Sequence, residues 1–394
     1  MTLPENGLFD IAVIGGGIQG AGVAQAASAA GYSTLLVERD SWAAATSRHS
    51  SKLVHGGLRY LESGQISLVY HSLRERRLLL RNAPELVKAV PFFIPVYRDT
   101  RRPPWLLRIG LSLYALLSGL TPLSRFRTLP PRVWGELDGL RRSDLRAVFS
   151  YWDAQTDDAR LTRAVIASAR ELQALCLEHT ELLNATRAGE FFELSLQTAQ
   201  SDAADAGDWQ CRARCIVNAA GPWVNEVAQR CGAPTRPLSW VKGSHIILPA
   251  VELPGIFYLE APRDGRAVFL MPWRSKTLVG TTEVEIDGPD AQPGADEIQY
   301  LLETVRHYFP EFPQQVEHAF AGVRVLPAAD ADRPFNRARE SVLARHERLV
   351  SIYGGKLTTY RQTAAQVIAQ LRPLLGRREQ RADTRSLALP AVDA

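Results

Sequence analysis

Three glycines near the N-terminus constrain the fold of this chain more than any other feature. Gly15, Gly17 and Gly20 follow an apolar run over Phe9–Ile14, which is typical of a buried parallel strand. In this pattern the first glycine permits a tight turn, and the second lets backbone N–H groups approach a pyrophosphate. The third lets the following helix pack close to the strand. The sequence therefore predicts a dinucleotide-binding turn.

A complete β-α-β unit surrounds this turn. We expect a helix of small residues over Ala21–Ala30 and a second strand over Thr34–Val37. Glu38 follows that strand, at the position expected to bind a pair of ribose hydroxyls. A carboxylate there would repel a 2′-phosphate, so the pattern disfavours a phosphorylated nicotinamide cofactor.

Two longer helices are expected farther along the chain. One spans Ile66–Asn82, is rich in arginine and leucine, and stops before Pro84. The other spans Leu161–His179.

A second glycine pair lies near the other end of the chain. Gly354-Gly355-Lys356 follows a strand-like run over Leu349–Ile352 and precedes a helix expected to reach Leu375. A helix N-terminus and a lysine both favour negative charge, which a reduced flavin carries. Lys356 is consistent with flavin stabilisation, with a substrate contact, or with a lysine that closes a surface loop. We expect strands from both chain ends to build one cofactor site.

Composition indicates two domains or one large discontinuous domain. The chain has 394 residues, of which 46% are hydrophobic and 22% charged, and this length is too great for a single core. A formal charge of +4 without a basic stripe argues against a nucleic-acid partner. The four cysteines fit neither a disulfide framework nor a zinc site, so we expect no metal. The N-terminus lacks the features of a secretory signal, and we expect a cytoplasmic protein.

The segment 103–127 is both apolar and basic. Its apolar part, Trp105–Leu120, is only 16 residues long and contains Arg108, so it is short for a membrane span. The arginines that flank or interrupt it are Arg101, Arg102, Arg108, Arg125 and Arg127. Two interpretations stay open: a helix lying at an anionic membrane surface, or a buried helix of a substrate-covering domain.

Several further segments are rich in glycine, hydroxyl groups and positive charge. By composition alone, the segment Thr46–Tyr60 is an ordinary polar loop. In order along the chain, the segments that carry a family resemblance are Val13–Gly22, Ala45–Ser47, Ser51–Glu62, Asp157–Leu161, Asn218–Trp223, Lys242–His245, Gly280–Thr282, Gly322–Arg324 and Tyr353–Arg361. Together they resemble the FAD-dependent glycerol-3-phosphate dehydrogenases of the quinone-linked type, over nearly the whole chain.

The resemblance implies an α/β fold with two parts. One is a discontinuous Rossmann-like FAD-binding domain of the amino-acid-oxidase type, expected to comprise residues 1–83, 151–235 and 336–394. The other is an α+β substrate-binding domain built on a mixed sheet, expected to comprise residues 84–150 and 236–335. Family members commonly carry a further C-terminal helical domain, which we do not expect in this chain.

The resemblance also implies which residues bind FAD. They are Gly15, Gly17, Ile18, Gln19, Gly20, Glu38, Arg39, Thr46, Ser47, Ser51, Lys52, Leu53, Gly221, Gly355, Lys356, Leu357 and Thr358.

Two arginines match positions that bind the substrate phosphate in the family. Arg324 and Arg339 carry planar guanidinium groups, which bind phosphate oxygens in bidentate fashion. A structural ion pair is the alternative role for Arg324. For Arg339 the match is less fixed, because Arg333 and Arg337 lie close enough in sequence to take its place. Further substrate contacts are expected from Arg59, Tyr60, Thr281 and Lys356.

Oxidation of a secondary alcohol removes a hydride from carbon and a proton from oxygen. A neutral imidazole is a suitable base for the proton, and we hypothesise that His55 has this role. A hydrogen-bonded histidine without a catalytic function is the alternative. The expected catalytic residues are His55, Arg324 and Lys356.

The sequence thus predicts oxidation of sn-glycerol 3-phosphate to dihydroxyacetone phosphate by hydride transfer to FAD, with quinone as the electron acceptor. The expected setting is the cytoplasm, with peripheral attachment to the inner face of the membrane and a homodimer as further expectations. Two other classes stay open: an FAD-dependent amino-acid or 2-hydroxy-acid oxidase or dehydrogenase on the same fold, and a flavin-binding electron-transfer subunit without catalysis.

Overall fold

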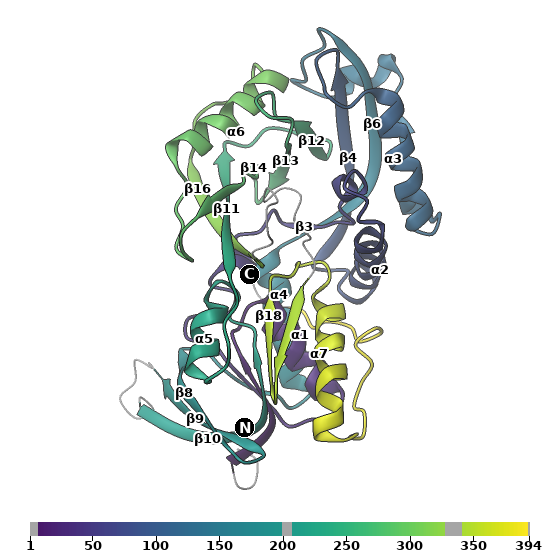
Figure 1. Cartoon of the computed structure of the whole chain (residues 1–394). Coiled ribbons are helices and arrows are strands. Elements are labelled where there is room, and N and C mark those ends of the chain that lie inside the picture. Colours follow the sequence, from purple (N-terminus) through teal and green to yellow (C-terminus); the bar gives the residue numbers. More distant parts are fainter. Residues whose placement is uncertain (1–6, 199–206, 328–340, 393–394) are drawn as a thin grey trace.

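The chain forms two sheets with helices packed on their faces (Figure 1). This computed structural model describes residues 7–198, 207–327 and 341–392. Within these ranges, no helix is both long and apolar enough to cross a lipid bilayer.

The first sheet joins strands from both ends of the chain. Its eight strands are β1 (Leu8–Ile14), β2 (Thr34–Val37), β7 (Leu175–Leu177), β8 (Thr180–Ala188), β9 (Phe191–Thr198), β10 (Gly207–Asn218), β17 (Val342–His346) and β18 (Leu349–Tyr353). The main path runs β17-β18-β10-β1-β2-β7, and all its pairs except β17–β18 are parallel. β8 and β9 form an antiparallel extension of β10. The carboxyl ends of β1, β2, β10 and β18 therefore meet at one edge.

Helices cover both faces of the first sheet. On one face, α1 (Ile18–Ala29), α4 (Asp158–Glu171) and α7 (Tyr360–Leu375) bury alanine, valine and leucine side chains against β1, β10 and β18. On the other face, α5 (Val224–Arg230) packs with the β8–β9 extension. Short 3₁₀ helices lie in the connections: η2 (Thr46–Arg48), η3 (Leu58–Leu61), η4 (Pro122–Ser124), η5 (Pro131–Glu136) and η6 (Gly221–Trp223).

The second sheet is mostly antiparallel. Its strands are β3 (Leu53–Val54), β4 (Val87–Tyr97), β5 (Arg127–Thr128), β6 (Leu145–Thr156), β11 (Leu238–Leu248), β12 (Ile256–Glu260), β13 (Ala267–Trp273), β14 (Lys276–Gly280), β15 (Val284–Ile286) and β16 (His318–Pro327). One parallel pair, β4 with β12, makes the sheet mixed.

Residues of β4 alternate between two apolar clusters on opposite faces of the second sheet, as a strand with a two-residue repeat requires. Phe92 and Ile94 pack with α2 (Ile66–Asn82) and α3 (Pro104–Leu117). Phe93 and Tyr97 pack with α6 (Ala295–Tyr308).

Most of the expected elements are present, but two expectations need correction. Helix α2 has the expected bounds, and β1, β2 and β18 match the predicted strands closely. The helix expected over 161–179 ends at Glu171 instead, because Gln173 takes a left-handed backbone conformation with φ of 72° and β7 then pairs with β2. The expected domain boundary at residue 150 falls inside β6, which stays in the second sheet as far as Thr156.

Candidate functional site

One cavity of about 320 Å³ is lined both by residues at the carboxyl edge of the first sheet and by residues of the second sheet. This is the edge at which open α/β sheets bind ligands. Most of the predicted residues line it: Gly15, Gly17, Ile18, Gln19, Glu38, Arg39, Thr46, Ser47, Ser51, Leu53, His55, Arg59, Tyr60, Gly221, Thr281, Arg324, Gly355, Lys356, Leu357 and Thr358. Gly20 and Lys52 do not line it, and Arg339 lies outside the described residues.

The turn between β1 and α1 leaves no room for side chains. Gly15 has φ of +111°, and a Cβ atom there would lie 2.6 Å from the carbonyl oxygen of Ala219. A Cβ atom on Gly20 would lie only 1.9 Å from the carbonyl oxygen of Gly15. Gly20 therefore acts by letting α1 approach the turn, as the sequence pattern predicts.

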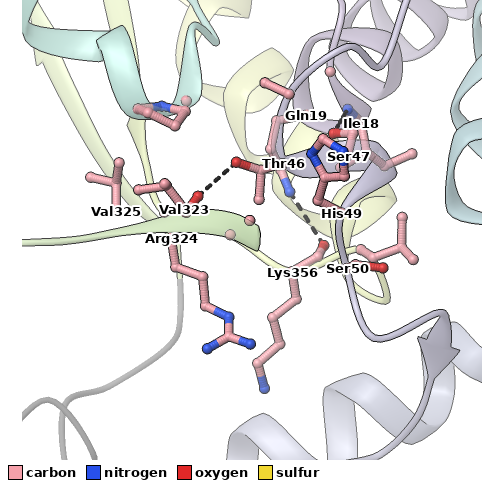
Figure 2. A pocket seen from close by; sticks show the side chains of 18 of the residues that line it. Ile18, Gln19, Thr46, Ser47, His49, Ser50, Val323, Arg324, Val325 and Lys356 are labelled. Atoms are coloured by element: carbon pink, nitrogen blue, oxygen red, sulfur yellow. Dashed lines mark hydrogen bonds between the residues drawn. The ribbon is translucent and has the colours of Figure 1, made fainter. Parts of the chain in front are cut away.

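The N-terminus of α1 opens toward the loop that carries η2. The hydroxyl oxygen of Ser47 accepts a hydrogen bond of 2.9 Å from the backbone N–H of Ile18, as Figure 2 shows. Thr46 fixes the same loop from the other side, because its hydroxyl donates to the carbonyl oxygen of Val323 at 2.6 Å. A helix N-terminus beside a hydroxyl group is suited to a phosphate group.

The carboxylate of Glu38 is fixed by the backbone. It accepts hydrogen bonds from the N–H groups of Gly16 at 2.6 Å and Asp40 at 2.9 Å. Burial raises the pKa of Glu38 above its ordinary value, while these two hydrogen bonds oppose the rise. Each oxygen keeps a lone pair for a ribose hydroxyl. Beside it, the guanidinium of Arg39 lies 4.2 Å from the ring centroid of Trp223.

The two ends of the chain meet through Gln19. Its side-chain amide donates to the carbonyl oxygen of Lys356 at 3.2 Å (Figure 2). Gly355 has φ of +117°, and a Cβ atom there would come within 2.6 Å of the Gln19 amide nitrogen. Among the described residues, no donor reaches the buried oxygen Oε1 of Gln19. Because an unpaired buried acceptor is costly, a ligand with hydroxyl groups fits this part of the cavity.

Three cationic side chains meet at the other end of the cavity. The Lys356 ammonium lies 3.8 Å from the ring centroid of Tyr60, and Figure 2 shows the Lys356 and Arg324 side chains pointing in the same direction. Arg59 and Arg324 share one partner, the Oε1 atom of Glu283, at 3.7 Å and 3.4 Å. Burial and the nearby Arg59 charge lower the pKa of Arg324 to about 10, so its guanidinium is still charged at neutral pH.

Thr281 belongs to the same end of the cavity. A Cβ atom on Gly243 would lie 2.6 Å from the Thr281 hydroxyl and 3.2 Å from Nη2 of Arg324. Gly243 therefore provides the space in which these two side chains approach each other.

The side chain of Lys52 does not line the cavity. Its ammonium donates to Asp158 at 2.8 Å and to the carbonyl oxygen of Arg48 at 2.5 Å, and its side chain is almost fully buried. The prediction that Lys52 contacts the cofactor receives no support from this geometry, because the ammonium is used to hold the η2 loop against α4.

Sequence reasoning missed several lining residues. One of them is Phe269, which lines the cavity and has an edge-to-face contact with His55, with ring centroids 6.1 Å apart. Nothing in the sequence around Phe269 indicates that it belongs to the site. His49 also lines the cavity; burial, with the nearby Lys52 charge, lowers its pKa to about 4. His49 lies within the Thr46–Tyr60 segment. Glu283, which does not line the cavity but pairs with Arg59 and Arg324, directly follows Gly280–Thr282. Proximity to these motifs was the signal available in the sequence.

The chain is similar in sequence to a family of FAD dependent oxidoreductases and to two dehydrogenases of polyol phosphates. Residues 10–361 match the family described as FAD dependent oxidoreductase. The chain is 38% identical to a D-erythritol 1-phosphate dehydrogenase of Brucella abortus, over 94% of this chain and 75% of the relative. It is 37% identical to a glycerol-3-phosphate dehydrogenase of Pseudomonas aeruginosa, over 94% of this chain and 73% of the relative.

A solved structure is similar over almost the whole chain. It is the glycerol-3-phosphate dehydrogenase from Bacillus halodurans complexed with FAD, which is 26% identical and aligns with a TM-score of 0.76. The alignment covers 97% of this chain and 68% of that one. The chain thus spans about three quarters of the length of the two sequence relatives and about two thirds of this structure.

Proposed function

Because the chain belongs to the family of FAD dependent oxidoreductases, we propose that it oxidises sn-glycerol 3-phosphate to dihydroxyacetone phosphate. The family membership confirms two predictions: the α/β fold with a Rossmann-like FAD-binding part and a mixed-sheet part, and FAD as the cofactor. The tight glycine turn, the Glu38 carboxylate and the unpaired Gln19 oxygen all suit this dinucleotide.

One observation carries the proposal. Arg59, Arg324 and Lys356 place three positive charges at the end of the same cavity whose other end holds the dinucleotide turn. Guanidinium groups bind the oxygens of a phosphate bidentately. A phosphorylated alcohol bound there would have its carbon chain directed toward the middle of the cavity. Two relatives named as dehydrogenases of polyol phosphates support this substrate class.

Bound FAD would supply the acceptor for the hydride. Arg324 and Arg59 would hold the phosphate, with Glu283 keeping the two guanidinium groups together. Lys356 would supply a positive charge that stabilises the negative charge that develops on the flavin when it is reduced. The Tyr60 ring fixes the position of that charge.

The proton of the substrate hydroxyl needs a base, and we propose His55 for this role. It lies in the connection between β3 and η3 and lines the cavity. In a His55→Gln variant, the rate of flavin reduction should fall by about 10²- to 10⁴-fold and lose its dependence on pH. A variant that keeps its turnover number and its pH profile would contradict the assignment.

The role of Arg324 can be tested by varying enzyme and substrate together. In an Arg324→Gln variant, kcat/KM for glycerol 3-phosphate should fall by about 10²-fold or more, because a phosphate contact is lost. The rate with unphosphorylated glycerol should hardly change. Arg263→Gln is a matched control, since Arg263 pairs with Glu303 at the surface. Equal losses for both substrates would indicate a structural ion pair instead.

A second substrate has a specific observation in its favour. The Brucella abortus relative is a D-erythritol 1-phosphate dehydrogenase, so longer polyol phosphates belong in the same assay. An amino acid or a 2-hydroxy acid is the alternative that the fold allows, with the arginines binding a carboxylate. Comparing kcat/KM across glycerol 3-phosphate, erythritol phosphate and glycine separates these classes.

For the electron acceptor we propose a membrane quinone, reached by peripheral binding through α3. One face of α3 packs on the second sheet, while Trp105, Ile109 and Leu116 on the other are each about 60% exposed. Arg108 and Arg125 are exposed nearby, and such a surface suits anionic lipid.

Arg102 contributes less to this surface than expected, because its guanidinium donates to Glu260 at 2.6 Å. Trp105→Ser with Ile109→Ser should reduce co-sedimentation with anionic liposomes and lower the rate with quinone. Leu183→Ser, on the exposed strand β8, is the control. If the α3 variant binds liposomes as well as the control does, α3 is not the membrane contact.

A further inference from the structure

Helix α2 carries two adjacent charged residues of opposite sign that are both buried. Glu75 is 2% exposed and Arg76 is 4% exposed. Successive residues of a helix project about 100° apart, so the two side chains extend toward different neighbours. Neither residue lines the cavity, and the proposed mechanism uses neither. Burying a charge costs free energy unless the charge is paired, so the partners of Glu75 and Arg76 show which parts of the chain they connect.

Glu75 holds the segment that follows the second glycine pair. Its carboxylate accepts from the Nε atom of Arg361 at 2.7 Å and from a second guanidinium nitrogen of the same residue. Arg361 lies in the first turn of α7, five residues after Lys356. This bidentate pair therefore anchors α7 at the end nearest to Lys356.

Arg76 holds the opposite wall of the cavity through a chain of three hydrogen bonds. Its guanidinium donates to Asp153 of β6 at 2.7 Å. The other carboxylate oxygen of Asp153 accepts from the Tyr114 hydroxyl of α3 at 2.5 Å. That hydroxyl in turn accepts from the backbone N–H of Gly56 at 2.9 Å. Gly56 directly follows His55 and lies three residues before Arg59.

The Tyr114 hydroxyl has fixed donor and acceptor roles in this chain of hydrogen bonds. Burial, together with the nearby Asp153 charge, raises the pKa of Tyr114 well above its ordinary value. The phenol therefore keeps its proton, donates it to the carboxylate, and uses its oxygen as the acceptor for Gly56. A Cβ atom on Gly56 would lie 2.4 Å from this oxygen, so the backbone approaches the phenol as closely as a glycine allows.

The two supported segments meet across the cavity. The Lys356 ammonium lies over the ring of Tyr60, and the two residues belong to the two segments that α2 supports. We propose that Glu75 and Arg76, through Arg361 and through Asp153 and Tyr114, are positioning residues that set the distance between the Lys356 segment and the His55–Tyr60 segment. The effect of these residues on kcat rests on the proposed function, whereas the claim that they hold the two segments in place does not.

The structural claim is tested by hydrogen–deuterium exchange on the FAD-loaded protein. Tyr114→Phe removes one oxygen atom and leaves the Gly56 N–H without its acceptor. Amide exchange in residues 55–62 should become about tenfold faster or more, because a buried N–H that loses its acceptor opens more readily; a tenfold change corresponds to about 1.4 kcal/mol. Residues 354–361 should change little. Glu75→Gln should give the reverse pattern, with faster exchange in residues 354–361.

A matched control is available in the same half of the molecule. The hydroxyl of Tyr308, also buried, donates to the carbonyl oxygen of Glu260 at 2.8 Å. Tyr308→Phe should leave exchange in both segments at the wild-type level. If Glu75→Gln does not fold, Arg361→Lys keeps the charge but loses the bidentate geometry, and the same pattern is expected from it.

The kinetic readout separates this inference from the proposed substrate. With whichever polyol phosphate reduces the wild-type flavin, Tyr114→Phe should lower kcat by about 10- to 100-fold, as expected for a displacement of catalytic groups by about 1 Å. The control should keep its kcat. If exchange changes as described but no polyol phosphate reduces the flavin of the wild type or of any variant, the substrate proposal fails and the positioning claim stands. Exchange in both variants at the control level would overturn the claim.

Discussion

Replacing Gly20 with alanine tests whether the β1–α1 turn is as closely packed as dinucleotide binding requires. A Cβ atom at this position would lie 1.9 Å from the carbonyl oxygen of Gly15. The obstructing atom belongs to the backbone of the turn itself, so rotation of a side chain cannot relieve the clash. Helix α1 must move away from the turn to admit one methyl group.

The expected loss follows from two opposing contributions. A helical glycine replaced by alanine gains about 0.5–1 kcal/mol, whereas overpacking of this kind costs about 1–3 kcal/mol. The free energy of unfolding of the Gly20→Ala protein should therefore fall, by as much as about 2.5 kcal/mol. Because the N-terminus of α1 moves with the helix, FAD affinity should fall by about tenfold or more, which corresponds to about 1.4 kcal/mol.

Gly110→Ala is the matched control, because Gly110 is also a helical glycine. It lies inside α3, and a Cβ atom there would have no neighbour within 4 Å. This variant should be stabilised by about 0.5–1 kcal/mol and should bind FAD normally. Urea unfolding of the FAD-free proteins gives the stabilities, and quenching of flavin fluorescence gives the affinities. Equal stability and equal FAD affinity in the two variants would refute the packing argument.

Three further outcomes are expected. Lys356→Met should slow flavin reduction by about 10²-fold in anaerobic stopped-flow mixing, because a charge that would stabilise the developing negative charge is lost; an unchanged rate would show that the Lys356 charge has no part in flavin reduction. Asp158→Ala should lower the free energy of unfolding by about 3–5 kcal/mol in urea denaturation, because it leaves the buried Lys52 charge unpaired; a loss below 1 kcal/mol would contradict this. The pKa of His49 is about 4 in the folded chain and near 6.5 when unfolded, so the unfolded state binds more protons between these values. Stability should fall as pH drops from about 6.5 toward 4, and a His49→Gln variant with the same pH dependence would refute that cause.

Sequence patterns predict those parts of this structure that are determined within a short stretch of the chain. The β1–α1 turn, the strand before it and Glu38 after β2 all lie within one short unit whose spacing is set by backbone geometry. Helix α2 was predicted with its observed bounds from its run of arginine and leucine residues and from Pro84, which follows it. Strand β4 was missed because Pro91 and Pro95 argue against a strand, although both are paired with β6 in the second sheet.

The arrangement of the site depends on contacts between distant segments. Neither periodicity nor composition indicates that Arg59 and Arg324 share Glu283, and the first two were expected only from the family resemblance. In the sequence, Glu75 and Arg76 belong to an ordinary run of alternating charges on a helix. Their burial depends on β6, α3 and α7, which are separated from α2 in the sequence and meet it only in the folded chain.

The most direct test of the central claim is anaerobic addition of sn-glycerol 3-phosphate to the FAD-loaded protein, followed by its visible absorption spectrum. We expect the oxidised flavin band to disappear, whereas an equal concentration of glycine should leave it unchanged and glycerol should reduce the flavin far more slowly. Loss of the band with glycine and none with glycerol 3-phosphate would contradict the proposed function.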